Sequence, residues 1–229
     1  MKGSLATINT TRKLIFIVIL YINVTNSIKR EHFKEYISFL SKITIKINTR
    51  GEQQQIFSSS FDQIYYPTSI VINNNEQPST TIGTNRFDLT NPPNIIVLTW
   101  ETYITNCQNM FSKCDKIEEV DLSGFVGTGV TNYNNMFEDC ISLTSINLSK
   151  LDTSSATDMS YMFLNCSKIT SLDLSSFNTL NVINMTYMFS GCKSLKYIHI
   201  SNFDISNVIN MFNMFHNCRA LESLDLSNF

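Results

Sequence analysis

The stretch ATDMSYMFLNCSKITSLDLSSF at residues 156–177 determines the predicted fold, because its pattern returns every 26 residues along the second half of the chain. The motif Met-Phe-x-x-Cys begins at Met110, Met136, Met162, Met188 and Met214. Apolar residues keep the same register on both sides of this motif, so five units span about 104–229. A period between 20 and 50 residues is typical of solenoids, propellers and other repeat arrays.

The pattern within each unit selects among these architectures. In the fourth unit, spacings of 3, 3, 1 and 3 separate Val182, Met185, Met188, Phe189 and Cys192, and they predict one face of a helix. The L-x-x-L-x-L pattern that follows predicts a short strand, whereas a propeller blade needs four strands. We therefore expect an α/β repeat solenoid, a leucine-rich-repeat-like right-handed coil with one short parallel strand and one helix per repeat.

Residues 28–103 lack the period, and their alternating apolar residues predict a small β-rich N-terminal cap. ITIKIN at 43–48 and QQQIF at 53–57 predict a hairpin around the turn TRGE. Further strands are expected at 68–73 and 94–100, and a short amphipathic helix at 30–41. We expect five leucine-rich-like repeats at 104–229, truncated at the C-terminus because the chain ends directly after a Leu-Asp-Leu-Ser segment.

The amino terminus predicts a secretory signal peptide over residues 1–27. Lys2, Arg12 and Lys13 precede the apolar run LIFIVILYI at 14–22, and polar residues follow it. This run is about half of the roughly 20 residues that span a bilayer. A signal anchor or a buried first helix remains the alternative. We expect a secreted or cell-surface protein, attached to a membrane only through a segment beyond Phe229, if at all.

The cysteines are expected to be buried free thiols. Five of the six recur at one interior register position, and Cys107 occupies a column that holds Tyr or Met in the other repeats. Disulfides between stacked repeats are the alternative. Intervals of 26 residues do not provide the short spacing of a zinc site.

Composition and motifs disfavour nucleic-acid binding and catalysis. Only 16% of the residues are charged, and 17 basic residues balance 19 acidic ones, so no field of one sign attracts phosphate. Motifs typical of metalloproteases, serine hydrolases and P-loops are missing from the sequence, and GFVGTG at 124–129 is expected to be a turn. We expect no enzyme activity and no catalytic, cofactor or metal site.

The outward positions of the predicted strands are candidates for binding a partner. They are Asp121, Asn147, Asp173, His199 and Asp225, flanked by Glu119 and Tyr197. A polar face that only keeps the protein soluble is the alternative. Asn147, Asn165 and Asn184 begin Asn-x-Ser/Thr sequons and are possible N-glycosylation sites.

The unit V-x-x-M-x-x-M-F-x-x-C-x-x-L-x-x-L-D-L-S-x-F, best seen at 156–177 and 208–229, resembles the BspA-like leucine-rich-repeat surface proteins. The same unit is similar to repeats of mycoplasma-type lipoproteins, although the cysteine that carries the lipid in those proteins has no counterpart here. The resemblance implies adhesion through protein-protein binding, with an extracellular protein or a host or microbial surface ligand as partner. A structural coat protein, or a non-catalytic fragment of a longer multidomain surface protein or enzyme, is the alternative.

Overall fold

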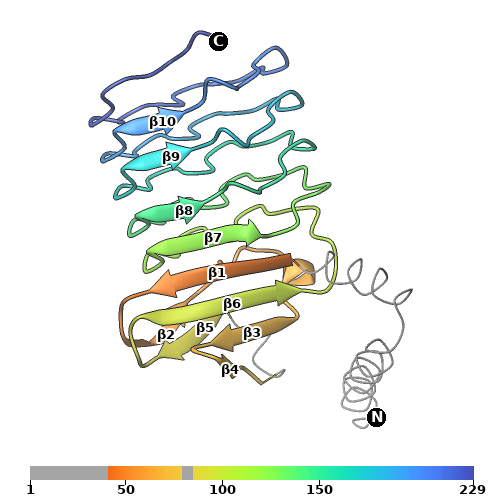
Figure 1. The fold of residues 1–229 in the computed structure, drawn as a ribbon, viewed down its shortest axis with the longest axis vertical. Helices are drawn as coiled ribbons and strands as arrows, with labels where there is room; N and C mark the ends of the chain where they lie inside the picture. The colour runs from red at the N-terminus through yellow and green to blue at the C-terminus, as the bar shows by residue number, and fades with distance from the viewer. Residues whose placement is uncertain (1–40, 79–84) are drawn as a thin grey trace, which may run out of the picture. The chain divides into compact units, whose positions relative to one another are not determined.

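The computed structural model describes residues 41–78 and 85–229 (Figure 1). The first strands are β1 (Ser41–Ile47), β2 (Gly51–Gln55), β3 (Ser69–Ile72), β4 (Asn75–Glu76), β5 (Arg86–Leu89) and β6 (Asn94–Trp100). The repeats contribute β7 (Glu119–Gly124), β8 (Ser145–Asn147), β9 (Ser171–Asp173) and β10 (Tyr197–His199). The predicted signal peptide and all but the last residue of the predicted helix at 30–41 lie outside the described residues.

One sheet connects the first strands to the repeats. Its strand order is β4-β3-β6-β1-β7-β8, while β9 and β10 form a separate parallel pair. β1 lies antiparallel to both β6 and β7, and β7 is parallel to β8. Ile43, Ile45 and Ile47 alternate along β1 and are fully buried, as period-two patterning requires. The strands predicted at 68–73 and 94–100 are confirmed as β3 and β6.

The predicted hairpin between 43–48 and 53–57 is wrong. β2 pairs with β5, and both edges of β1 are occupied by β6 and β7. The buried side chain of Asn94 holds the chain as it leaves β1, because its Nδ2 donates to the carbonyl oxygens of Ile47 at 3.3 Å and Thr49 at 3.1 Å. Alternation therefore located these strands, but their pairing depends on contacts between distant segments.

The prediction of an α/β solenoid with one helix per repeat is also wrong. We number the repeats as 104–129, 130–155, 156–181, 182–207 and 208–229. In the fourth repeat, the backbone N–H of Met188 donates to the carbonyl oxygen of Met185 at 3.2 Å, and that of Tyr187 donates to Phe212 of the next repeat at 2.9 Å. An α-helix instead needs donation to the residue four positions back. The described part of the chain is β-rich, with a 3-10 helix at Gln63–Tyr65 as its one helical element.

Left-handed backbone conformations explain why these segments are turns. Two residues per repeat have φ between 54° and 75°: Asn109 and Lys113, Asn135 and Asp139, Tyr161 and Asn165, Tyr187 and Gly191, Asn213 and Asn217. Seven of these ten are Asn, Asp or Gly, the residues that adopt this conformation most readily. Consecutive tight turns bring apolar side chains inward at spacings that resemble those of a helix, so the spacing alone was misleading.

Stacked side chains form the core of the repeats. The rings of Phe111, Phe137, Phe163, Phe189 and Phe215 follow one another with centroid separations of 5.4, 5.5, 5.9 and 5.4 Å. Five of the six cysteines are fully buried and Cys218 is half-buried, so their predicted core position is confirmed. Within the described residues, no helix has the length and apolar character needed to cross a membrane.

The segment before the repeats contacts the first repeat on two sides. On the strand side, β1 pairs with β7. On the turn side, the backbone N–H of Ser58 donates to the carbonyl oxygen of Met110 at 2.9 Å, and the preceding Phe57 is buried. Trp100 packs edge-to-face against Phe125 with a centroid separation of 6.2 Å. These contacts place β1 beside the repeat strands and so extend their outer face.

Candidate functional site

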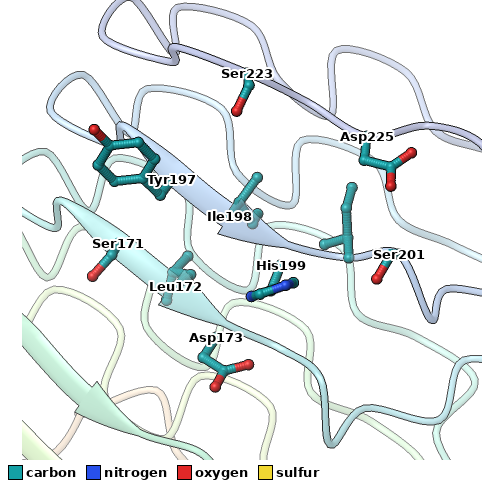
Figure 2. A pocket seen from close by; sticks show the side chains of 10 residues that line it. Ser171, Leu172, Asp173, Tyr197, Ile198, His199, Ser201, Ser223 and Asp225 are labelled. Carbon is teal, nitrogen blue, oxygen red and sulfur yellow. The ribbon is translucent and has the colours of Figure 1, made fainter.

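The structure divides the predicted partner-binding residues into two groups. Asp173, Tyr197, His199 and Asp225 line one open depression of about 410 Å³ on the outer face of β9 and β10. Figure 2 shows His199 between Asp173 and Asp225, with Tyr197 at the opposite end of β10. Ser171, Ser201 and Ser223 contribute to its polar lining. We call this depression the Tyr197–His199 groove.

The second group lies outside the groove, on β7 and β8. Glu119 forms an ion pair with Lys46 of β1 at 2.5 Å, and Asn147 donates from Nδ2 to Oδ1 of Asp121 at 3.0 Å. Both side chains of the ion pair are partly exposed, so it contributes little to stability. Glu119, Asp121 and Asn147 are thus engaged with their neighbours along the sheet.

Sequence reasoning did not identify the basic residues that β1 adds to this face. Lys42 and Lys46 alternate with the buried isoleucines of β1 and are aligned with Gly124 and Glu119 of β7. The alternation of SKITIKI at 41–47 indicates that Lys42 and Lys46 lie on the exposed face of a strand. The sequence does not indicate that this strand pairs with the first repeat strand, so the lysines could not be assigned to the repeat face.

Most of the outward acids and amides close a local turn with their own side chain. In each case Oδ1 accepts a hydrogen bond from the backbone N–H of the serine two residues later, which forms an Asx turn. The serine N–H and the Oδ1 that accepts it are those of Ser123 and Asp121 at 2.9 Å, Ser149 and Asn147 at 3.2 Å, Ser175 and Asp173 at 3.0 Å, and Ser227 and Asp225 at 2.9 Å. Hydrogen bonds from these serines lower the pKa of Asp121, Asp173 and Asp225. These carboxylates therefore remain ionised at neutral pH.

The fourth repeat departs from this arrangement at both outward positions. His199 replaces the Asp or Asn, and among the described residues its side chain makes no corresponding hydrogen bond to Ser201. Tyr197 stands where three of the other repeats have serine and the first has Glu119. Its side chain is 55% exposed, so the large ring is not buried in the core. His199 does not close the turn of its repeat, and the exposed ring of Tyr197 adds nothing to the core, which marks the pair as the strongest functional candidate on this face.

Tyr197 is held in place by a charged neighbour. Its hydroxyl donates to Oε2 of Glu222 at 2.8 Å, and Lys196 Nζ lies 3.7 Å from Oε1 of the same glutamate. The bond to Glu222 raises the pKa of the Tyr197 phenol, so the phenol stays protonated at neutral pH. The ring is consequently oriented before any partner arrives.

The three sequon asparagines lie in different environments. Asn147 is exposed on β8, and Asn165 is exposed in a turn, where its Nδ2 donates to Oδ1 of Asp139 at 2.9 Å. Asn184 is half-buried, and its Oδ1 accepts the backbone N–H of Thr186 at 3.0 Å and the Thr186 hydroxyl at 2.6 Å. Glycan attachment would occur at Nδ2, the atom that Asn147 and Asn165 use to contact a neighbouring repeat.

The groove offers charged and aromatic groups for contact. In the described residues, no hydrogen bond joins the His199 imidazole to a serine hydroxyl, as activation of a nucleophile would require. No three His, Cys, Asp or Glu residues of the described ranges 41–78 and 85–229 are grouped so that they could hold a metal ion. The arrangement is suited to contact with another molecule.

Two family models match the chain. One, described as BspA type Leucine rich repeat region (6 copies), covers residues 26–155. The other, described as Mycoplasma protein of unknown function, DUF285, covers residues 97–229. Each match covers more than half of the 229 residues. No curated protein and no solved structure matches the chain.

Proposed function

Because the chain belongs to the BspA-type leucine-rich-repeat family, we propose that it is a secreted or cell-surface adhesion protein that binds another protein through its outer strand face. Repeat proteins commonly bind partners on extended surfaces of this kind. The partner is an extracellular protein or a ligand on a host or microbial surface. In this proposal, residues 1–27 form the signal peptide and residues 28–103 the N-terminal cap.

The replacement of a turn-closing side chain by His199 is the observation that carries this proposal. Asp173 and Asp225, in the repeats on either side, each accept a backbone N–H that stabilises their turn. A net intramolecular hydrogen bond contributes about 0.5–1.5 kcal/mol, so its loss in the fourth repeat needs a compensating benefit. Binding at the groove supplies that benefit.

Tyr197 supports the same conclusion. Exposed tyrosines are enriched in binding interfaces because they offer a large rigid contact area with a polar end. Here the hydroxyl is occupied by Glu222, while the residue as a whole is more than half exposed. The binding function requires no catalysis, in agreement with a family that is generally non-catalytic.

The proposal is tested by returning the fourth repeat to the pair found in the second. Tyr197→Ser with His199→Asn reproduces Ser145 and Asn147, which the chain already accommodates. The purified full chain is assayed on immobilised fibronectin, laminin and collagen, and on intact microbial cells. The wild-type chain is expected to bind at least one of these surfaces, and the double variant to lose that binding.

The control is Asp158→Asn, outside the groove and the strand face, which reproduces the asparagine that the other four repeats have at this position. It is expected to bind like the wild type. Binding that survives in the Tyr197→Ser/His199→Asn variant would contradict the proposed site. A wild-type chain that binds none of these surfaces would contradict adhesion itself.

A further inference from the structure

We infer that the Tyr197–His199 groove recognises a positively charged side chain, arginine or lysine, presented by the partner protein. This inference rests on the proposed function and adds the chemistry of the partner. It follows from the charges that line the groove and from the exposed aromatic ring.

Apart from the imidazole of His199, the charged groups that line the groove are negative. Two carboxylates, Asp173 and Asp225, line it, and none of its lining residues is lysine or arginine. Both carboxylates are fixed by the turns that they close, so little ordering is lost when a cation arrives. An acidic side chain would be repelled from the same position.

Tyr197 contributes a second feature that suits a cation. A tyrosine ring attracts an ammonium or guanidinium group over its face. Because its hydroxyl is bonded to Glu222, the ring is held at the end of the groove while more than half of the side chain stays exposed. Lys196, the nearest basic residue in sequence, lies within 3.7 Å of the same glutamate and does not line the groove.

Two of the aliphatic residues that line the groove are withdrawn into the core. Leu172 and Ile200 line the groove but are only 3% and 1% exposed, because they point into the core of the repeats. Ile198 is partly buried and packs against the same core. The surface that remains accessible is formed by hydroxyls, carboxylates, the imidazole of His199, the ring of Tyr197 and the exposed part of Ile198.

The test is an NMR titration of the ¹⁵N-labelled full chain with capped tripeptides. Gly-Arg-Gly is compared with Gly-citrulline-Gly, which has nearly the same shape without the charge, and with Gly-Glu-Gly. The arginine peptide is expected to shift the amide signals of β9 and β10, and the citrulline peptide to bind about tenfold more weakly. Equal binding of the arginine and citrulline peptides, or no shift at β9 and β10 with arginine, would overturn the inference.

Matched charge variants test whether the carboxylates of Asp173 and Asp225 bind the cation. Asp173→Asn with Asp225→Asn removes two charges from the groove, while asparagine can still close each turn as Asn147 does. Asp152→Asn with Asp204→Asn removes two charges from Asx turns that do not line the groove. The first pair is expected to weaken arginine-peptide binding about tenfold and the second to leave it nearly unchanged. Equal effects of the two pairs would show a general charge effect and overturn the inference.

The inference and the proposed function fail in different ways. If Tyr197→Ser/His199→Asn abolishes adhesion while Asp173→Asn/Asp225→Asn leaves it intact, the binding site stands and recognition of a cation is wrong. If the arginine peptide binds the groove but adhesion survives in the Tyr197→Ser/His199→Asn variant, the groove prefers cations and the proposed adhesive role is wrong.

Discussion

The thiol of Cys140 donates a hydrogen bond to the backbone carbonyl oxygen of Phe111, 3.1 Å away in the preceding repeat. Cys166, Cys192 and Cys218 make the same contact to Phe137, Phe163 and Phe189 at 3.1–3.2 Å. The cysteine column therefore connects each repeat to the one before it, in addition to filling the core. Cysteine suits this position because it is a small hydrophobic residue that also has a weak S–H donor, whereas alanine has no side-chain donor.

Native-state alkylation tests the burial of this column. Burial raises the pKa of the Cys114 thiol to about 12 and also raises the pKa of Cys140 and Cys166. The reactive thiolate is thus scarce at pH 8, and the sulfur is shielded. Cys218 is only half-buried, so iodoacetamide should label it first and label the others only after unfolding. Mass spectrometry that found Cys114 labelled as fast as Cys218 in the folded chain would contradict this assignment.

The left-handed turns predict that glycine is more stable than alanine at Asn135, whose φ is 55°. Alanine in this conformation costs about 1 kcal/mol or more, whereas glycine adopts it freely. Asn135→Gly should therefore be more stable than Asn135→Ala by about 1 kcal/mol in urea unfolding. In an α-helix the order would be reversed, because glycine is there about 1 kcal/mol less favourable than alanine.

A control position shows whether glycine is favoured over alanine only where φ is positive. Thr157 is exposed, lies directly before the bridge residue Asp158 and does not have a positive φ. Thr157→Gly should not be more stable than Thr157→Ala, because the conformational freedom of glycine offers no advantage there. The same preference for glycine at both positions would contradict the left-handed assignment at Asn135.

The Asx turns predict how stability depends on pH. Hydrogen bonds from Ser154 and Ser175 lower the pKa of Asp152 and Asp173 below the ordinary 3.8. A carboxylate whose pKa is lower in the folded state stabilises the protein above its unfolded pKa, and this contribution is lost as pH falls through the folded value. The free energy of unfolding should therefore decline below about pH 4, whereas these groups cause no change between pH 5 and 7.

Asparagine substitution isolates these two carboxylates. Asp152→Asn/Asp173→Asn should remain close to wild type at pH 7, because asparagine accepts the same backbone N–H. The decline of its unfolding free energy between pH 5 and pH 2 should be smaller than that of the wild type, as measured by denaturant titration at each pH. An identical decline in both proteins would show that other groups control acid unfolding.

The sequence predicted the stacked columns because a 26-residue register repeats the same inward residue in each unit. Phe137 and Cys140 are buried for the reason that the pattern suggested. The helix was a wrong prediction because the spacing between Met185, Met188 and Phe189 is shared by helices and by consecutive tight turns. The asparagine at position 135, like most of the residues with positive φ in the other repeats, is of a type that favours left-handed backbone. The spacing of the apolar residues contains no information about this conformation.

The candidate site was predicted in part. Asp173, Tyr197, His199 and Asp225 were expected on one face and line one groove. Their different roles could not be predicted, because the turn closed by Asp173 is a local hydrogen bond that becomes visible only when the repeats are compared in three dimensions. Pairing of β1 with β7 was inaccessible for a related reason, since it joins segments more than seventy residues apart.

The single variant His199→Asn tests the central claim that the fourth repeat gives up a turn for binding, because it leaves the bond from Tyr197 to Glu222 in place. His199→Asn should gain about 0.5–1.5 kcal/mol in unfolding free energy from a new bond to Ser201, while Asn147→His should lose at least a similar amount. Stability and adhesion are measured on the same preparations. The account predicts that His199→Asn is more stable than the wild type and adheres less. A His199→Asn variant that is less stable than the wild type, or that adheres equally well, would contradict it.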